Sequence, residues 1–226
     1  MADFFQLPEP PPERERPKPQ RQRPWWMRPR GELAGVMPLE LVVAKNDLAA
    51  VAISRVGAYS AGFEFELVIM LSERGAEADI DPSLFHPGPR RRRGPGAEGD
   101  QLRFGVQFAD GSKATNLDRS WAEHRDEPPP GPVLRTGGGG GGDSEWRQSI
   151  WVWPLPPPGP LAFVCEWPVA GIELTRVEID AQQLIDAAAR AQRIFGEPAG
   201  ESDADASSSG SVTASVITQT LTESDG

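Results

Sequence analysis

The sequence predicts a mainly β protein, namely an antiparallel β-sandwich with one C-terminal α-helix and disordered tails. Apolar and polar residues alternate in seven or eight short stretches between residues 39 and 179, which is the period of a half-buried strand. No alternating helical pattern separates these stretches, which argues against a parallel sheet and favours two packed antiparallel sheets. The composition of the 226-residue chain also changes sharply at both ends.

The two ends have compositions that favour solvation. Residues 1–30 hold eight prolines among charged residues and glutamines, and residues 197–226 hold six acidic residues, many Ser and Thr, and no Lys or Arg. Such segments bury too little apolar surface to offset the entropy of ordering. We therefore expect a disordered proline-rich arm at 1–30, a β-sandwich domain at 31–196 and a disordered acidic tail at 197–226. Within the arm, only Trp25–Met27 is apolar enough to pack back on the domain.

The alternating stretches predict strands along the whole domain. Asp110-Gly111 follows one of them and accepts the positive φ of a tight turn, so it predicts a β-hairpin. Four phenylalanines occupy the apolar phase of their strands and are expected in the core: Phe65, Phe104, Phe108 and Phe163. The predicted strands are 39–43, a run beginning at 51–53, 63–71, 102–108, 113–115, 146–153, 161–167 and 172–179.

One segment near the C-terminus has helical periodicity instead. Asp180 is a candidate N-cap, with Gln183 as its capping-box partner. Gly196 and Pro198 are residues that end helices. The pattern predicts a helix from Asp180 to Phe195 that docks on the sheets through Leu184, Ile185, Ala188, Ala191, Ile194 and Phe195.

Two long segments between strands are predicted to be mobile loops. Residues 73–101 contain the run Arg90–Arg93, and residues 117–145 contain the six glycines Gly137–Gly142. A phosphate-binding loop needs Lys-Ser/Thr after its last glycine, whereas Asp143-Ser144 follows here. The glycine-rich loop is therefore expected to be a flexible spacer.

Three segments resemble an uncharacterised actinobacterial protein family. They are 102–116 (LRFGVQFADGSKATN), 133–142 (VLRTGGGGGG) and 150–191, which includes the WPLPPPGPL link and the CEWP strand. Together they cover about a third of the chain. The resemblance implies a bacterial origin and a soluble β-rich domain, and it implies no activity, cofactor or catalytic residue.

The candidate catalytic residues are few. Neither His86 nor His124 has an HxxxH or CxxC companion, so we expect no metal and no cofactor. His124 with Asp126 and a hydroxyl such as Ser120 or Ser144 would be the nucleophilic constellation of an enzyme. The single cysteine, Cys165, lies in an apolar run and is expected to be a small buried hydrophobe; it cannot form an internal disulfide.

Two clusters of side chains suggest binding. Arg90–Arg93 and Trp25-Trp26 could contact nucleic acid, but the net charge of -10 and the absence of a recognition motif argue against such a partner. Trp151 and Trp153 share one face of a strand, opposite Ile150 and Val152. If the aliphatic pair faces the core, the tryptophans either lie under the helix or loops or form a recognition patch for a sugar, a proline-rich peptide or an apolar ligand.

These observations favour a bacterial β-sandwich that works as a binding or scaffold module for a protein or small ligand. The alternative is a hydrolase or small-ligand enzyme that uses a loop histidine. No apolar stretch approaches the roughly 20 residues that cross a bilayer, so no membrane insertion is expected. The first residues show no secretory signal, so a cytoplasmic location is expected. The sequence predicts no particular oligomeric state.

Overall fold

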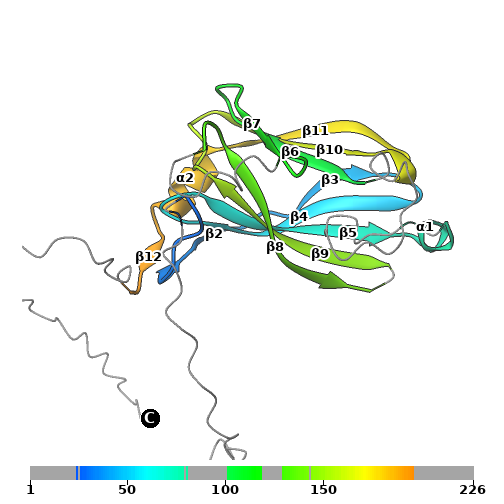
Figure 1. Cartoon of the computed structure of the whole chain (residues 1–226), viewed down its shortest axis with the longest axis horizontal. Helices are drawn as coiled ribbons and strands as arrows, with labels where there is room; N and C mark the ends of the chain where they lie inside the picture. Colours follow the sequence, from blue (N-terminus) through cyan, green and yellow to red (C-terminus); the bar gives the residue numbers. More distant parts are fainter. Residues whose placement is uncertain are drawn as a thin grey trace, which may run out of the picture.

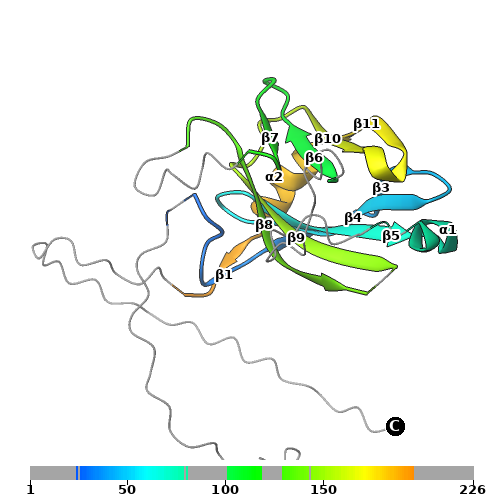
Figure 2. The same cartoon turned by 45° about the vertical axis from the view of Figure 1, so that its right-hand side comes forward.

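Two antiparallel sheets face each other across a core that both supply (Figures 1 and 2). The computed structural model describes residues 24, 26–78, 80, 101–118, 129–142 and 144–195. Figure 1 shows one layer made of β6, β7, β10 and β11, the other containing β4, β5, β8 and β9, and helix α2 at one end. Within the described ranges, no helix has the length and apolarity needed to span a membrane. The β-sandwich predicted from the sequence is confirmed.

The larger sheet has six strands in the order β2-β4-β5-β9-β8, with β3 also paired to β4. Every pair in it is antiparallel. Its strands are β2 (Gly35–Met37), β3 (Leu41–Lys45), β4 (Ala49–Ala58), β5 (Phe63–Leu71), β8 (Val133–Gly141) and β9 (Glu145–Trp153).

The smaller sheet has four strands in the order β11-β10-β6-β7. The predicted hairpin is present, since β6 pairs with β7 and Gly111 has φ +86° in the turn between them. A separate two-stranded ribbon joins β1 to β12. The strands are β1 (Glu32–Leu33), β6 (Arg103–Gln107), β7 (Lys113–Thr115), β10 (Pro160–Trp167), β11 (Ile172–Asp180) and β12 (Gln192–Arg193), and the short helices are α1 (Glu73–Glu77), η2 (Pro168–Ala170) and α2 (Gln182–Ala188).

Phenylalanine rings from both sheets meet at the centre of the core. The ring of Phe65 on β5 lies edge-on to Phe163 on β10, 5.5 Å between centroids, and 5.9 Å from the ring of Phe104 on β6. These three residues and Phe108 are each at most 4% exposed, so the four predicted core phenylalanines are confirmed. Each ring can occupy this place because its strand alternates in phase with the core.

A single asparagine ties the two layers together at one end. The Oδ1 atom of Asn46, in the turn from β3 to β4, accepts hydrogen bonds from the N–H groups of Leu48 and Ala49. Its Nδ2 atom donates to the carbonyls of Ala170 and Gly171, which connect β10 to β11. One side chain therefore closes a turn in one layer and holds a connection of the other.

The C-terminal helix is shorter than predicted. The predicted N-cap at Asp180 with Gln183 as its partner is wrong, because the N-cap is Ala181, which makes no side-chain capping bond; Asp180 Oδ1 instead accepts the Gln182 N–H from the end of β11, and α2 ends at Ala188 and not near Phe195. Beyond the helix the Gly31 carbonyl accepts the N–H groups of Ile194 and Phe195, and β12 pairs with β1. Strand pairing with the N-terminal segment thus replaces the last helical turns, and Ile194 and Phe195 are exposed.

The ordered domain begins earlier than the predicted boundary at residue 31. Trp26 is only 3% exposed, so this part of the arm packs on the domain, as the apolar run Trp25–Met27 suggested. The rest of the arm (residues 1–23), the Arg90–Arg93 run and the acidic tail after Phe195 lie outside the described residues.

We expect Phe163→Ala to lower the free energy of unfolding by about 3 to 5 kcal/mol, because it removes buried apolar surface and leaves a cavity between the sheets. Leu174→Ala is the matched control, since Leu174 lies on the neighbouring strand and is 72% exposed. That change should shift the free energy by about 0.5 kcal/mol or less. Urea denaturation of both variants tests this, and equal losses would contradict the assignment of the core.

Candidate functional site

The predicted catalytic residues are not brought together by the part of the chain that the structure describes. Four of them lie outside the described residues: His86, Ser120, His124 and Asp126. The enzyme hypothesis rests on these residues and stays a prediction. Ser144 is exposed at the turn between β8 and β9. Among the described residues, no three His, Cys, Asp or Glu side chains converge as metal ligands would.

Cys165 is a buried apolar residue of β10. Its side chain is inaccessible and belongs to the core, as predicted. Burial raises the pKa of the Cys165 thiol to about 12, and the nearby carboxylate of Glu166 raises that pKa as well. A nucleophilic cysteine needs the opposite shift, so this thiol is inert at neutral pH.

The tryptophans of β9 lie on the face that was predicted for them. Ile150 and Val152 are fully buried in the core, so Trp151 and Trp153 point away from the other sheet. Trp151 is nevertheless only 6% exposed, and Trp153 is half-buried. Trp151 is therefore not available as an open recognition patch.

The N-terminal segment, and not the C-terminal helix, covers Trp151. The indole N–H of Trp151 donates to the Trp26 carbonyl at 3.2 Å, and the Tyr59 ring packs edge-on against it at 5.7 Å. Helix α2 instead contacts β2 and β4 and adds Leu184 and Ala187 to the core. Of the alternatives for Trp151, cover by the helix is therefore not the one found, because the apolar face of α2 closes the end of the sandwich; cover by a loop segment is.

Two arginines fasten this N-terminal segment to the sheet. The Arg135 guanidinium of β8 lies 5.8 Å from the centre of the Trp26 ring and donates to the Met27 sulfur at 3.0 Å. Arg28 forms an ion pair with Glu64 at 2.9 Å and lies over the Tyr59 ring. This side of the six-stranded sheet is therefore closed around Trp151 and the start of β8.

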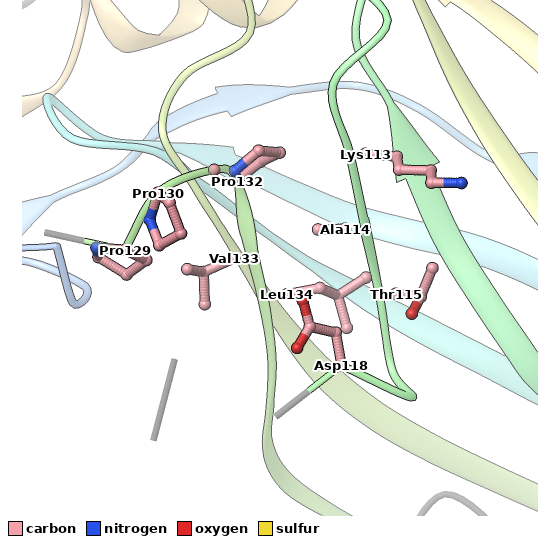
Figure 3. A pocket seen from close by; sticks show the side chains of 10 residues that line it. Lys113, Ala114, Thr115, Asp118, Pro129, Pro130, Pro132, Val133 and Leu134 are labelled. Atoms are coloured by element: carbon pink, nitrogen blue, oxygen red, sulfur yellow. The ribbon is translucent and has the colours of Figure 1, made fainter. Parts of the chain in front are cut away.

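A cavity of about 220 Å³ lies between the start of β8 and the hairpin strand β7 (Figure 3). Pro129, Pro130 and Pro132 form one wall, and Lys113 and Asp118 supply the charged groups. Pockets that bury most of a small ligand are usually about 300 to 1,000 Å³. This cavity is smaller than that range, and its polar side chains are those of Lys113, Thr115 and Asp118.

The glycine run forms a strand, which contradicts the predicted flexible loop. Gly139, Gly140 and Gly141 pair with Gln148, Arg147 and Trp146 of β9. A bulge between Thr136 and Gly139 sets this register.

Gln148 is a buried side chain that holds the glycine strand in place. Its Nε2 atom donates to the Gly137 carbonyl at 2.7 Å, and its side chain is fully buried against β8. The sequence carried one signal of this pairing, because Gln148 occupies the inward phase between Trp146 and Ile150. A polar residue in that phase needs a backbone partner.

The glycines fall into two alternating sets. A Cβ atom at Gly139 would lie 2.5 Å from the Gln148 Oε1 atom, one at Gly137 would lie 3.2 Å from the Ser149 Oγ atom, and one at Gly141 would overlap the Glu145 carbonyl. At Gly138, Gly140 and Gly142 a Cβ atom would meet nothing within 4 Å. Close packing on β9 explains the first set. It does not explain why the second set lacks side chains.

The distal half of β8 is also an edge without the usual protection. Proteins shield sheet edges with charged side chains, short strands, bulges or a covering element. Three other edge strands of the described part have such protection. β11 exposes the charged residues Glu173, Arg176 and Glu178. β7 and β2 have only three residues each, and α2 packs against β2. Beyond its bulge, β8 pairs only with β9 among the described strands, and Gly139–Gly141 are exposed. We therefore take this run as the candidate site.

Two neighbouring glycines should respond in opposite directions to the same substitution. Gly141→Ala should lower the free energy of unfolding by about 1 to 3 kcal/mol, because the added methyl overlaps the β9 backbone. Gly140→Ala should leave it unchanged or raise it by up to about 1 kcal/mol, because Ala has less conformational freedom to lose. Chemical denaturation of both variants measures the difference, and equal destabilisation would show that β8 does not pair as described.

Native Cys165 should resist alkylation by iodoacetamide at pH 8 and react fully once the protein is unfolded. A variant with Ser144→Cys adds an exposed thiol to the same chain and should gain one label at once under native conditions. Since the folded pKa is raised, the thiol favours folding below its ordinary pKa of about 8.5, and this contribution is lost as the pH rises towards 12. Mass spectrometry counts the labels; rapid labelling of native wild type would refute burial.

The comparisons with known proteins identified no relative of this chain. No family model, no curated protein and no solved structure matches the chain. What can be inferred about function therefore rests on the β8 edge and its chemistry.

Proposed function

We propose that this chain is a binding module that accepts an extended peptide along the distal edge of β8. The observation that carries the proposal is that Gly138 and Gly140 face open space in the half of an edge strand that consists of glycine alone. Packing within the described chain does not require glycine at these two positions. A peptide backbone that approaches the edge closely does benefit from glycine there.

Strand addition explains how such an edge would bind. An edge strand presents unpaired N–H and C=O groups, and an extended peptide that pairs with them gains main-chain hydrogen bonds. Each bond adds only about 0.5 to 1.5 kcal/mol net. Pairing with Gly139–Gly141 therefore gives weak and reversible binding, to which the side chains of the peptide must contribute.

The glycines also indicate which peptides fit. Because β8 has no side chains beyond its bulge, it offers none to pack across a new interface, and the peptide must supply the apolar cover. Cross-strand pairs with β-branched or aromatic residues contribute about 0.2 to 1 kcal/mol each, and an aromatic ring can cover an edge glycine. The preferred ligand is thus an uncharged peptide without proline that is rich in β-branched or aromatic residues.

The geometry of β8 limits where the peptide can lie. The bulge between Thr136 and Gly139 interrupts the register, and the Gly137 carbonyl already accepts the Gln148 amide. Before the bulge, β7 contacts β8 and Arg135 is engaged with Trp26 and Met27. The accessible run is therefore Gly138–Gly141.

The proposal places the module in the cytoplasm of a bacterial cell. It also makes the partner a protein segment and not a small ligand. The lone, reduced Cys165 suits a reducing compartment. The resemblance to actinobacterial proteins supports the bacterial origin. The cavity beside β7 is smaller than ordinary small-ligand pockets, which favours the edge over that cavity.

A charge placed on the edge tests the proposal. Peptides selected from a displayed random library on the full chain should be uncharged, free of proline and rich in β-branched or aromatic residues. Gly140→Lys should weaken their binding about tenfold or more, since edge lysines disfavour strand addition. Gly142→Lys is the matched control: it adds the same charge at an equally open position beyond the end of β8, and binding should persist.

Fluorescence anisotropy with labelled peptides measures both affinities, and denaturation confirms that both variants fold. Equal binding to wild type and Gly140→Lys would refute the edge as the site. The same library is also selected on the Val216→Pro variant, which is described below. If no peptide selected on either protein depends on Gly140 for binding, the proposed function is refuted.

A further inference from the structure

We infer that the strand that occupies the β8 edge in the isolated protein is the chain's own segment 211–221. This inference rests on the proposed function, because it names the occupant of the same edge. An external peptide would compete with this segment for the same edge.

The chemistry of the edge selects this segment from the sequence. The occupant should be uncharged, free of proline and rich in β-branched residues, because β8 supplies only backbone. Residues 1–23, 81–100 and 119–128 each contain proline and charged residues. Residues 211–221 (SVTASVITQTL) contain neither, and six of these eleven are Val, Ile or Thr.

The segment also has the alternation that an added strand needs. Val212, Ala214 and Val216 share one phase, and Thr213, Ser215 and Ile217 share the other. Each phase would lay side chains over one face of the glycine strand. The charged residues of the tail lie outside the segment, since the chain is uncharged from Ala206 to Thr222.

A second copy of β8 is a poorer occupant of the same edge. Two glycine strands would pair through their backbones alone, with no side chains to pack across the new interface. The main-chain bonds would then have to offset the association entropy of two whole proteins, which is at least about 4 kcal/mol. The tail segment brings the missing side chains and belongs to the same molecule.

The linker is long enough for pairing in cis. Phe195 is the last described residue, and 15 residues separate it from Ser211. A fully extended linker of this length spans about 50 Å, and a flexible one averages about 22 Å. A domain of about 160 residues has a radius of gyration near 15 Å and is about 40 Å across, so the extended linker is longer than the domain is wide.

The covalent tether between segment 211–221 and the domain determines the fraction of molecules in which so weak a contact forms. A short flexible tether gives an effective concentration in the millimolar range. A peptide of this composition that binds with a dissociation constant of about 0.3 mM would therefore be mostly bound in cis and mostly free between molecules at micromolar concentrations. The acids that flank the segment, such as Asp205 and Glu223, would further oppose pairing between molecules.

Amide hydrogen exchange on the full chain, followed by NMR, tests the inference. Two sets of wild-type amides should be protected: those of residues 212–220, and those of Gly138–Gly141 that do not bond to β9. With millimolar tethering, both sets should exchange several-fold to about tenfold more slowly than they would without the tail on the edge. Val216→Pro should abolish both protections, because proline lacks the donor and distorts a strand. Ser208→Pro is the matched control: it makes the same change in the linker of the same tail and should leave both protections intact.

The outcomes separate this inference from the proposed function. Glycine protection that survives Val216→Pro would show a different occupant and overturn the inference. Protection that disappears on dilution would assign the edge to the tail of a second copy and also overturn it. If the wild-type tail is unprotected while library peptides bind in a Gly140-dependent manner, the inference fails and the proposed function stands. If Val216→Pro also binds no library peptide at β8, both fail.

Discussion

The contact of Phe65 with Phe163 and Phe104 is the interaction on which the rest of the structure depends. It joins β5 of one sheet to β10 and β6 of the other, with ring centroids 5.5 and 5.9 Å from Phe65. Because side chains alternate along a strand, these three rings fix the phase of all three strands at once. A slip of one residue in β5 would turn Phe65 out of the core and bring Glu64 or Glu66 into it.

The same phase determines what the larger sheet presents on its outer face. Phe65 is paired with Ile150, so Ile150 points inward and Trp151 points outward. An exposed indole at that place would add to an apolar surface, and the chain covers it with Trp26 and Tyr59. Arg135 and Arg28 then hold the covering segment in position. The consequence is that an aromatic face that would suit ligand binding is used for stability, and the accessible backbone is found at the edge of the sheet.

The glycine strand combines close packing on one side with an open edge on the other. Gln148 bonds the Gly137 carbonyl and leaves no room for a side chain at Gly139, and the Glu145 carbonyl of β9 leaves none at Gly141. Glycine weakens a strand because of its conformational freedom, so this half of β8 depends on β9 for its order. A strand of this kind gains from a second neighbour on its free side. This gain is the physical reason for our proposal that β8 accepts an extended peptide, and a tethered segment of the same chain is the partner that would require the least association entropy.

The sequence by itself determined the fold class and the buried side of the main strands, because period-two alternation marks which side of a strand is buried, and Phe65, Phe104, Phe108 and Phe163 are buried as that pattern requires. It also determined the turn at Gly111, which depends on local chemistry. Only the tertiary structure decided the rest. The last turns of the predicted helix gave way to pairing of β12 with β1, and Trp151 was covered by an N-terminal segment more than a hundred residues away. The glycine run, which has no side chains and hence no periodicity to detect, became a strand because β9 supplies hydrogen-bonding partners along it. A neighbouring strand can order a segment whose own composition favours flexibility, and no local pattern reports such a neighbour.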